Sequence, residues 1–360
     1  MKKKTEPSYQ RIPHSRPTLG PEETERLTEV VRSGYLAQGK MVQAFEQAFT
    51  EKMSGRTSAA VSSGTAALHL VLLAMGIGAK DEVIIPSYVC TALLNAVQYV
   101  GARPVLADID PETHNIDPDD VKKRMTRRTK AMIVPHMFGL PADMERLTRL
   151  NVPIIEDCAQ AVGGTYAGKP VGTFGQAAIF SFYATKVMTT GEGGMVVSDS
   201  KKLMARVNDL RDYDERDQYK IRYNYKMTDI QAALGLAQLA KLETFIQRRR
   251  RIARKYSQFL KEYGLKLPCA DPGHIYFRYI VGLKSDSATV IQRLQEKGIM
   301  SARPVYKPLH QYLKLKGYPH TTRTWRHAVS LPIYPSLSRD GVNKVLSIFT
   351  TVLKETGYGQ

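Results

Sequence analysis

Short apolar segments alternate with amphipathic ones between about residue 55 and residue 200. Several of the short segments are apolar on both faces, which is typical of parallel strands covered by helices. The predicted strands are Thr57–Val61, Glu82–Ile85, Pro104–Asp108, Ala131–Pro135, Pro153–Glu156, Ala178–Phe182 and Met195–Val197, and the predicted helices between them are Ala66–Met75, Thr91–Val100, Pro118–Met125 and Ala142–Leu150. This alternation predicts an open, doubly wound α/β domain, in which ligands gather at the carboxyl ends of the strands.

Amphipathic helices flank this domain on both sides. Pro21–Ser33 and Val42–Met53 precede it, and a long helical pattern from Thr228 to about Tyr263 follows it. A helix of that length is expected to bend or break, and Gly264 is expected to end it.

The rest of the chain is predicted to form a smaller α+β domain. Its predicted elements are an alternating strand at Ile275, Phe277, Tyr279 and Val281 and helices at Ala288–Lys297 and Arg339–Lys354. The predicted division is a tail over residues 1–20, a large α/β domain over 21–245 and a small C-terminal α+β domain over 246–360.

The chain is basic, with a formal net charge of +18 over 360 residues. Such a charge suits either nucleic acid or anionic small molecules. The densest basic run, Gln247–Arg251, keeps helical spacing and is predicted to be a solvated helix face. No RRM-type aromatic motif, helix-turn-helix signature or zinc-finger spacing accompanies it, so nucleic-acid recognition is not predicted.

The cysteines and the chain termini bear on the compartment. Cys90, Cys158 and Cys269 are widely spaced and form no CxxC pair, which favours a reducing compartment without a disulfide frame or a zinc site. The basic N-terminus lacks the apolar core of a signal peptide, and no apolar run approaches the roughly 20 residues that span a bilayer. We therefore expect a cytoplasmic protein with no membrane or metal partner.

Three motifs at predicted strand ends could carry chemistry, although each also has an ordinary structural explanation. Ser62–Leu68 places hydroxyl residues and glycine at a helix start, which suits either a phosphate or a plain serine cap. Asp157 closes a buried strand and could hold a cationic nitrogen, cap a helix or form a salt bridge. Lys186 follows another buried strand, with Ser181 before it and Gly191–Gly194 after it, and would be either a desolvated amine or a solvent-facing loop lysine.

The order of these motifs predicts a phosphorylated pyridine cofactor. The helix start would hold the phosphate, Asp157 would keep the ring nitrogen protonated, and Lys186 would form a Schiff base. A competing segment, Gly163–Pro170, has the spacing of a P-loop, but Pro170 stands where Ser or Thr is required and no helix is predicted after it.

With these motifs the sequence resembles the DegT/DnrJ/EryC1/StrS family of PLP-dependent sugar aminotransferases, which have the aspartate aminotransferase-like fold type I. The resemblance covers nearly the whole chain and includes Arg16–Pro17, Gly34–Gly39, Phe45–Glu46, Ser63–Leu68, Asp81–Ile84, Pro86–Ser87, Glu156–Ala161, Gly172–Gly175, Phe180–Gly194, Asn224–Thr228, Gln231–Ala233, Gln238–Leu239 and Pro308–His310. It implies a large PLP-binding domain with a mostly parallel seven-stranded sheet and a smaller C-terminal domain.

The resemblance also implies roles for the matching residues. Lys186 would form the Schiff base with pyridoxal 5'-phosphate (PLP) and move the proton, Asp157 would contact the pyridinium nitrogen, and Gln160 would face the cofactor ring. The phosphate would be bound by Gly64, Thr65 and Ser181.

One position departs from the family pattern. The family usually has an aromatic residue stacking on the cofactor ring where this chain has Cys90, so either Tyr88 or another aromatic residue fills that space, or the ring packs differently. Asn224 matches an asparagine that reaches the phosphate of the neighbouring subunit, which implies a homodimer with shared active sites. Tyr183 and His310 are expected substrate contacts.

The implied reaction is a two-step amino transfer from L-glutamate to a keto group of a nucleotide-linked (deoxy)sugar. Because Lys186 is retained, this reaction is favoured over that of the family's sugar dehydratases, in which histidine can replace the lysine. The alternatives are a cyclitol aminotransferase acting on a keto-inositol, a non-catalytic regulator of the same fold, and a nucleic-acid binder supported by charge alone. An intact Asp157 and Lys186 argue against the regulator.

Overall fold

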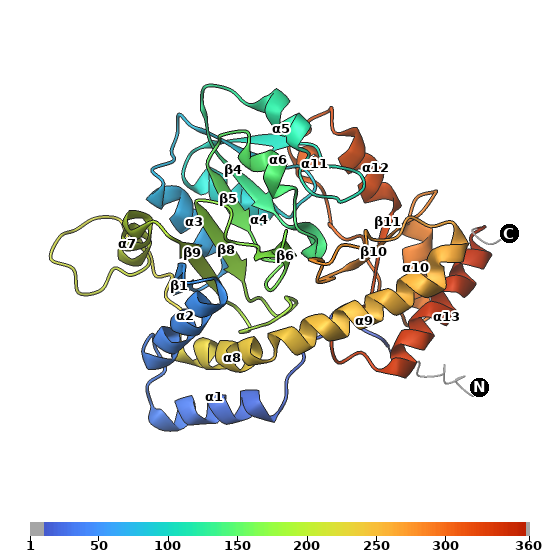
Figure 1. The fold of residues 1–360 in the computed structure, drawn as a ribbon, viewed down its shortest axis with the longest axis horizontal. Coiled ribbons are helices and arrows are strands. Elements are labelled where there is room, and N and C mark those ends of the chain that lie inside the picture. The colour runs from blue at the N-terminus through green and yellow to red at the C-terminus, as the bar shows by residue number, and fades with distance from the viewer. Residues whose placement is uncertain (1–10, 358–360) are drawn as a thin grey trace, which may run out of the picture.

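Seven strands form one sheet in the larger part of the molecule, in the order β1-β9-β8-β5-β4-β2-β3 (Figure 1). The computed structural model of the chain describes residues 11–357. Four strand pairs are parallel, whereas β9 runs antiparallel to both β1 and β8. The strands are β1 (Thr57–Val61), β2 (Glu82–Pro86), β3 (Arg103–Ala107), β4 (Thr129–Pro135), β5 (Ile154–Asp157), β8 (Ala177–Ser181) and β9 (Gly194–Ser198). The predicted mostly parallel, seven-stranded sheet is therefore confirmed.

Helices cover both faces of this sheet, because most of its strands bury apolar side chains on both sides (Figure 1). One face packs against α3, α4 and α7, and the other against α2, α5, α6 and α8. The bounds are α2 (Lys40–Lys52), α3 (Gly64–Ala74), α4 (Thr91–Tyr99), α5 (Pro118–Arg124), the 3-10 turn η1 (Met137–Gly139), α6 (Met144–Thr148) and α7 (Lys201–Leu210). Helix α7 was missed from the sequence, although Ser200 caps it and its buried Leu203, Met204 and Val207 keep helix spacing.

The long helical pattern after the sheet is broken, as predicted. It forms α8 (Asp229–Ala240) and α9 (Leu242–Leu260), with the break at Lys241. A 3-10 turn, η2 (Lys261–Tyr263), ends at Gly264, whose φ of 62° is left-handed and suits glycine. Helix α1 (Pro21–Ser33) packs against α8, and α9 leads from the sheet to the smaller domain (Figure 1).

The smaller domain packs helices around a two-stranded antiparallel sheet. Its elements are β10 (Tyr279–Gly282), α10 (Ala288–Glu296), α11 (Leu309–Tyr312), α12 (Pro319–His327), β11 (Ala328–Leu331) and α13 (Arg339–Glu355). Ile12, which the sequence placed in a tail, is buried in this core and pairs with Ile299. The first ten residues of that tail lie outside the described residues. The predicted domain boundary at residue 245 falls inside α9, so it stays a prediction.

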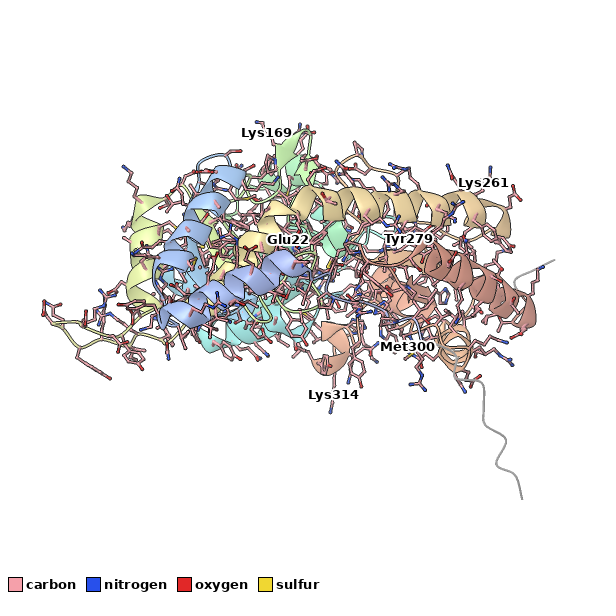
Figure 2. The ribbon with its side chains drawn as sticks, turned by 90° about the horizontal axis from the view of Figure 1, so that it is seen from below. Glu22, Lys169, Lys261, Tyr279, Met300 and Lys314 are labelled. Carbon is pink, nitrogen blue, oxygen red and sulfur yellow. The ribbon has the colours of Figure 1, made fainter. Side chains whose placement is uncertain are left out.

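The strand predicted from the alternation at residues 275–281 is shorter than expected. Tyr276 has a left-handed φ of 52°, which interrupts extended backbone, so β10 begins only at Tyr279. Ile275 and Phe277 pack into the core of the large domain, whereas Tyr279 and Val281 pack into that of the small one. The alternating apolar residues of this segment therefore pack into two different cores. Tyr279 is labelled within the small domain in Figure 2.

The arginine run on α9 was wrongly interpreted as a solvated face. Arg249 is 1% exposed and its guanidinium donates to the carbonyl oxygens of Phe277 (3.2 Å) and Ile333 (2.9 Å). Arg248 and Arg250 likewise donate to carbonyl groups of loops in the small domain. Because a guanidinium carries five donors, it can satisfy loop carbonyls that have no partner in a strand or helix. The run thus connects α9 to the small domain.

The segment with P-loop spacing is a β-hairpin of β6 (Thr165–Tyr166) and β7 (Lys169–Pro170). Ala167 and Gly168 have φ values of 47° and 78°, as a two-residue hairpin turn requires, so the segment does not cradle a phosphate. Lys169 follows this turn at the molecular surface (Figure 2). None of the helices within residues 11–357 combines the length and apolar character needed to cross a membrane.

Candidate active site

Lys186 lies in the loop between β8 and β9, where its N–H donates to the carbonyl oxygen of Tyr183 (2.8 Å). The side chain is half-buried, and its Nζ lies 5.4 Å from the centroid of the Phe277 ring. Burial lowers the pKa of Lys186, and the nearby Cys90 and Asp157 oppose that shift. An amine with a lowered pKa loses its proton more readily, as a nucleophile or base must. The loop therefore does not leave Lys186 as a freely solvated lysine.

Asp157 ends β5 and is 6% exposed. Its Oδ1 accepts from the N–H of Ala159 (2.9 Å), and no described residue donates to Oδ2. Burial raises the pKa of Asp157, whereas the Ala159 N–H, Lys186 and His136 lower it. A buried carboxylate with one open oxygen gains most from a cationic partner, so the position suits a protonated nitrogen of a ligand.

Cys90 is the residue just before α4, at the position where the family usually has an aromatic residue. The residue reaches solvent, yet the protein packed around the thiol raises its pKa, and Lys186 and Asp157 both act on it electrostatically. Tyr88 instead is fully buried, with its ring in edge contact with Phe138 (6.1 Å). The structure thus brings Cys90 to Lys186 and Asp157, while Tyr88 belongs to the core.

The start of α3 forms an open cup of hydrogen-bond donors beside the end of β8. Ser63 caps the helix by accepting from the N–H of Ala66 (3.1 Å), so the serine-cap interpretation is correct. Within residues 11–357, the N–H groups of Gly64 and Thr65 and the hydroxyls of Thr65 and Ser181 have no partner. A Cβ on Gly64 would lie 2.8 Å from that of Ser181, so only glycine allows this approach. The cup keeps donors free for an anion.

Gln160 and Asn224 belong to segments that are bonded to different elements of this region. The Oε1 of Gln160 accepts from the N–H of Phe138 (2.9 Å), which fixes the side chain near the end of β4. Asn224 is exposed, and the neighbouring Tyr225 carbonyl accepts from the N–H of Ser62 (2.8 Å). The segment carrying Asn224 therefore lies beside the cup of its own chain, and its contact across a subunit boundary stays a prediction.

The two expected substrate contacts, Tyr183 and His310, differ in exposure and in hydrogen bonding. Tyr183 is 46% exposed, close in the chain to Lys186. His310 is 6% exposed, and its Nδ1 and Nε2 are bonded to the hydroxyls of Ser87 (2.7 Å) and Thr322 (3.3 Å). In this arrangement His310 positions the segment before Cys90, so a direct contact with substrate stays a prediction for both residues and is better supported for Tyr183.

Arg278 is a residue at this site that the sequence patterns did not identify. Its guanidinium carbon lies 4.7 Å from the centroid of the Phe277 ring, the same ring that Lys186 approaches. Its Nη1 is buried without a hydrogen-bond partner. The available signal was a single charged residue inside the apolar segment from His274 to Val281. The sequence analysis used only the apolar positions of that segment and gave this arginine no role.

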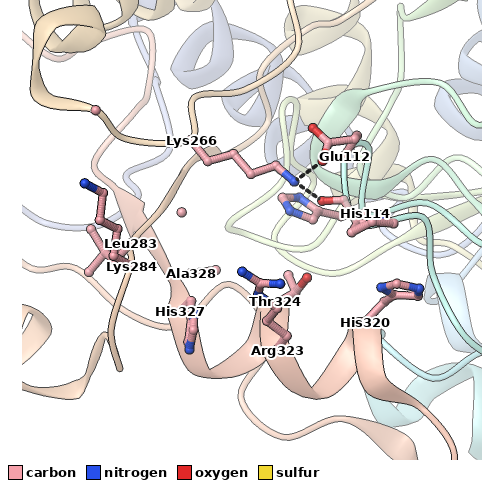
Figure 3. Close-up of a pocket in the computed structure, with 13 residues that line it drawn as sticks. Glu112, His114, Lys266, Leu283, Lys284, His320, Arg323, Thr324, His327 and Ala328 are labelled. Carbon is pink, nitrogen blue, oxygen red and sulfur yellow. Dashed lines mark hydrogen bonds and ion pairs between the residues drawn. The ribbon is translucent and has the colours of Figure 1, made fainter.

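A basic cavity of about 420 Å³ is a second feature that the sequence did not predict (Figure 3). Lys266 pairs there with Glu112 (2.8 Å), whereas Lys284 and Arg323 have no acidic partner in the part of the chain that is described. The cavity lies between the segment after β3 and the small domain, with His320 from α12 on its wall. Its cations give the surface a local affinity for anions.

Comparisons with known proteins agree along most of the chain. The DegT/DnrJ/EryC1/StrS aminotransferase family model matches residues 17–350. GDP-perosamine synthase of Escherichia coli O157:H7 is 37% identical over 349 residues, which cover 92% of this chain and 95% of that protein. The aminotransferase TlmJ from Streptoalloteichus hindustanus superposes with a TM-score of 0.91 and 31% identity, over 96% of this chain and 100% of that chain. The PLP form of Spr1654 from Streptococcus pneumoniae, described as a sugar aminotransferase, has a TM-score of 0.89 and 28% identity over 96% of this chain and 99% of that one. The expected fold type I is therefore confirmed.

Proposed function

Because the chain belongs to the DegT/DnrJ/EryC1/StrS aminotransferase family, we propose that it transfers the amino group of L-glutamate to a keto group of a nucleotide-linked sugar. The chain is an aminotransferase. The observation that carries the proposal is the grouping of Lys186, Asp157 and Cys90 beside the donor cup of α3. The nucleotide part of the substrate is supported by similarity to a GDP-perosamine synthase.

The residues at this site fit pyridoxal 5'-phosphate. The unpaired donors of Gly64, Thr65 and Ser181 suit its phosphate, and the glycine leaves the space that a Cβ would fill. Asp157 offers an open carboxylate oxygen to a ring nitrogen, and Lys186 an amine of lowered pKa to its aldehyde carbon. Donors for a phosphate, an acid for a cationic nitrogen and a reactive amine are the three groups that this cofactor requires.

When bound, PLP supplies an electron sink that stabilises negative charge at the carbon that loses a proton. Asp157 supports that role by holding a cation at its buried carboxylate, and the pairing also removes the cost of burying the carboxylate alone. Gln160 helps to fix the loop after β4 beside this position through its bond to Phe138.

Lys186 is the acid and base of the proposed reaction. Its Nζ takes the proton from the α-carbon of L-glutamate, and it returns a proton to the sugar carbon when the amino group is delivered. Such transfer is efficient when the pKa of the base is near the working pH, and burial lowers the pKa of Lys186 in that direction. Retention of this lysine favours amino transfer over dehydration.

The proposed assembly is a homodimer in which Asn224 reaches the phosphate of the neighbouring subunit. The exposed side chain of Asn224 has no partner within residues 11–357, which leaves it free for such a contact. Mixing an inactive Lys186 variant with an inactive Asn224 variant should restore some activity, because one site in a mixed dimer would contain both native residues. Absence of rescue in demonstrated mixed dimers would contradict shared sites.

Absorbance and isotope transfer test the reaction directly. The protein loaded with PLP should show a cofactor absorbance band that L-glutamate shifts and 2-oxoglutarate restores. With isotopically labelled amino nitrogen in L-glutamate, mass spectrometry should then find the label on one member of a panel of nucleotide-linked ketosugars. A colourless protein that takes up no PLP and transfers no label would contradict the proposal. Transfer to a keto-inositol alone would support the cyclitol alternative.

A further inference from the structure

The basic cavity of about 420 Å³ is formed by segments that are far apart in the sequence (Figure 3). One wall is the loop after β3, residues 111–114, which belongs to the large domain. The other walls belong to the small domain and are α12 and the chain around the paired residues Lys266 and Gly282. A cavity of this volume lies in the range that holds a small organic ligand.

One face of α12 supplies polar side chains to this cavity. Four lining residues of the helix follow the spacing i, i+3, i+4 and i+7 and therefore share one stripe, namely His320, Arg323, Thr324 and His327. Such a stripe alone would be an ordinary solvated face, but here it faces a second wall of the cavity. Lys266 and Arg323 approach the same space from opposite walls (Figure 3).

The cavity has an excess of positive charge because the acids beside it are engaged. Glu112 is the one acid that lines it within residues 11–357, and it pairs with Lys266 (2.8 Å). Asp108 accepts from two N–H groups in the first turn of α12 (3.0 and 2.8 Å). Lys284 and Arg323 are left without an acidic partner among the described residues. The net charge of the lining therefore favours an anion.

The kinds of side chain on the walls indicate the class of anion. An ammonium, a guanidinium and imidazole N–H groups around one space offer donors to more oxygens than a single carboxylate carries. Phosphate groups match such donors, and a diphosphate uses more of them than one phosphate does. The aliphatic surface of Pro111, Leu283 and Ala328 lies beside the cations and would contact an uncharged part of the ligand. The lining thus suits an organic molecule that carries a diphosphate.

The cavity lies apart from the site of amino transfer. None of Lys186, Asp157 and Cys90 lines it. Strand β10 follows directly after Arg278 and ends at Gly282, which is part of the cavity wall. Because a strand rises about 3.3 Å per residue, β10 separates Arg278 from this wall by on the order of 10 Å. A ligand in the cavity would leave the position of Lys186 free.

We propose that the cavity is a second ligand site, which binds a small organic diphosphate such as a nucleoside diphosphate. This inference is independent of the proposed aminotransferase reaction. Lys284 and Arg323 neutralise the phosphate groups, and His320 and His327 donate hydrogen bonds to them. Because the walls come from both domains, the bound ligand also joins the large domain to the small one.

The test uses ADP as the probe and the PLP-loaded protein. Isothermal titration calorimetry at about 0.15 M salt, where long-range attraction is screened, should show saturable binding. Arg323→Gln should weaken the Kd about 10- to 100-fold, since hydrogen bonds to charged groups contribute in that range, and Lys284→Gln should also weaken it. Absence of saturable binding to the unaltered protein would overturn the proposal.

Arg326→Gln is the matched control for Arg323→Gln. It removes the same charge from the same helix, but Arg326 lies off the stripe and does not line the cavity. This variant should bind ADP as the unaltered protein does. Equal weakening in the two variants would mean that ADP senses only the overall charge of the surface, and this result would overturn the proposal.

Pyrophosphate and AMP identify the group that is recognised. Both should bind more weakly than ADP, because pyrophosphate lacks the organic part and AMP lacks one phosphate. Pyrophosphate binding as tight as that of ADP would restrict the site to the inorganic ion and overturn the assignment to an organic ligand. Equal binding of AMP and ADP would overturn the assignment to a diphosphate.

Thermal unfolding and kinetics give independent readouts. ADP should raise the Tm of the unaltered protein and of Arg326→Gln, and should raise that of Arg323→Gln less, because a ligand of the folded state stabilises it by mass action. Arg323→Gln should keep the KM values for L-glutamate and for the sugar acceptor. A raised KM for the sugar alone would make the cavity part of the substrate site and overturn a separate site. PLP uptake, read by absorbance, tests the proposed function and should be the same in all these variants.

Discussion

Glu156 and Asp157 are neighbours at the end of β5 and both are buried, but their surroundings differ completely. Successive residues of a strand point to opposite faces of the sheet, so the two carboxyl groups meet different partners. Both oxygens of Glu156 are bonded within the protein, whereas Asp157 has an oxygen for which the described chain supplies no donor.

The Glu156 side of the strand is internally complete. Its Oε2 accepts from His136 Nε2 (3.1 Å) and the N–H of Gly172 (2.7 Å), and its Oε1 accepts from the N–H groups of Phe174 and Gly175 (both 2.7 Å). Burial alone would raise the pKa of Glu156, but these bonds outweigh it and the pKa is lowered. A carboxylate with this many donors fixes the loop that follows the β6–β7 hairpin.

On the Asp157 side, polar groups lack partners within the described chain, and this holds for Asp157 and for the groups near it. Lys186 has a lowered pKa without an ion pair, the cup at α3 has free donors, and Arg278 has no counter-ion within residues 11–357. The contrast teaches that, at the carboxyl ends of this sheet, polar groups satisfied by the chain support the fold, while unsatisfied ones mark where a ligand is expected.

The largest effect is expected at Lys186. Lys186→Ala should reduce turnover by about 10²–10⁴-fold or more, because general acid–base catalysis alone accounts for that range and covalent attachment of the cofactor is also lost. Steady-state kinetics measures it, with circular dichroism to check the fold. Lys169→Ala, on the exposed hairpin, is the matched control and should keep full activity. Full turnover in Lys186→Ala would refute the role of this lysine.

Glu156→Gln should affect stability rather than chemistry. We expect a loss of about 3 kcal/mol in the free energy of unfolding, because the buried network loses its negative charge and one of its two acceptor oxygens. Denaturant unfolding measures it, with exposed Glu51→Gln as the control. The folded-state pKa of Glu156 is lowered, so its stabilisation is present above its ordinary pKa of 4.5 and is lost as the pH falls through the folded-state value. A change below about 0.5 kcal/mol would contradict the contrast between the two carboxyl groups.

Asp157→Asn should show the opposite pattern. Turnover should fall about 100-fold or more, while the free energy of unfolding of the cofactor-free protein at pH 7 should not decrease. The pKa of Asp157 is higher in the folded state than its ordinary value of 3.8. Ionisation of this carboxyl therefore lowers the free energy of unfolding as the pH rises from 3.8 through the folded-state pKa. The variant, which cannot ionise there, should lack this pH dependence. Unfolding at several pH values tests the sign. A strongly destabilised Asp157→Asn protein would show that Asp157 is structural.

The smallest effect is expected at Cys90. Because its thiol pKa is raised, alkylation by iodoacetamide near pH 7.5 should be slower than that of a free thiol and should accelerate as the pH increases. Lys186 lowers the thiol pKa through its charge, so Lys186→Ala should slow alkylation a little further. Mass spectrometry of the modified peptide measures both rates. Faster alkylation in the variant would mean that Cys90 and Lys186 are not neighbours.

Local patterns predicted the elements of the large domain well. The predicted strand Thr57–Val61 matches β1, and the helix predicted at Pro21–Ser33 matches α1, because burial on one or both faces leaves a direct period in the sequence. A break in the long helix also followed from its length, and the structure places that break at Lys241. Asp157 and Lys186 could be proposed because each stands just after a predicted buried strand.

Long-range contacts were the part that local patterns missed. Arg249 was assigned to solvent because its partners, the carbonyl groups of Phe277 and Ile333, are distant in the sequence. Arg278 received no role from the sequence, because its contact with the Phe277 ring near Lys186 depends on how distant segments pack. The hydrogen bonds of His310 to Ser87 and Thr322 were likewise not foreseen, and its contact with substrate stays a prediction.

The sequence by itself determined the periodic burial of each segment, the glycine turn at Gly264 and the presence of the residues that a PLP aminotransferase needs. Only the tertiary structure decided which of those polar groups are satisfied. It joined Glu156 to His136 and left Asp157 open, and it brought Cys90 rather than Tyr88 to Lys186. The physical reason is that burial period is a local property of a chain, whereas hydrogen-bond and charge partners depend on how distant segments pack together.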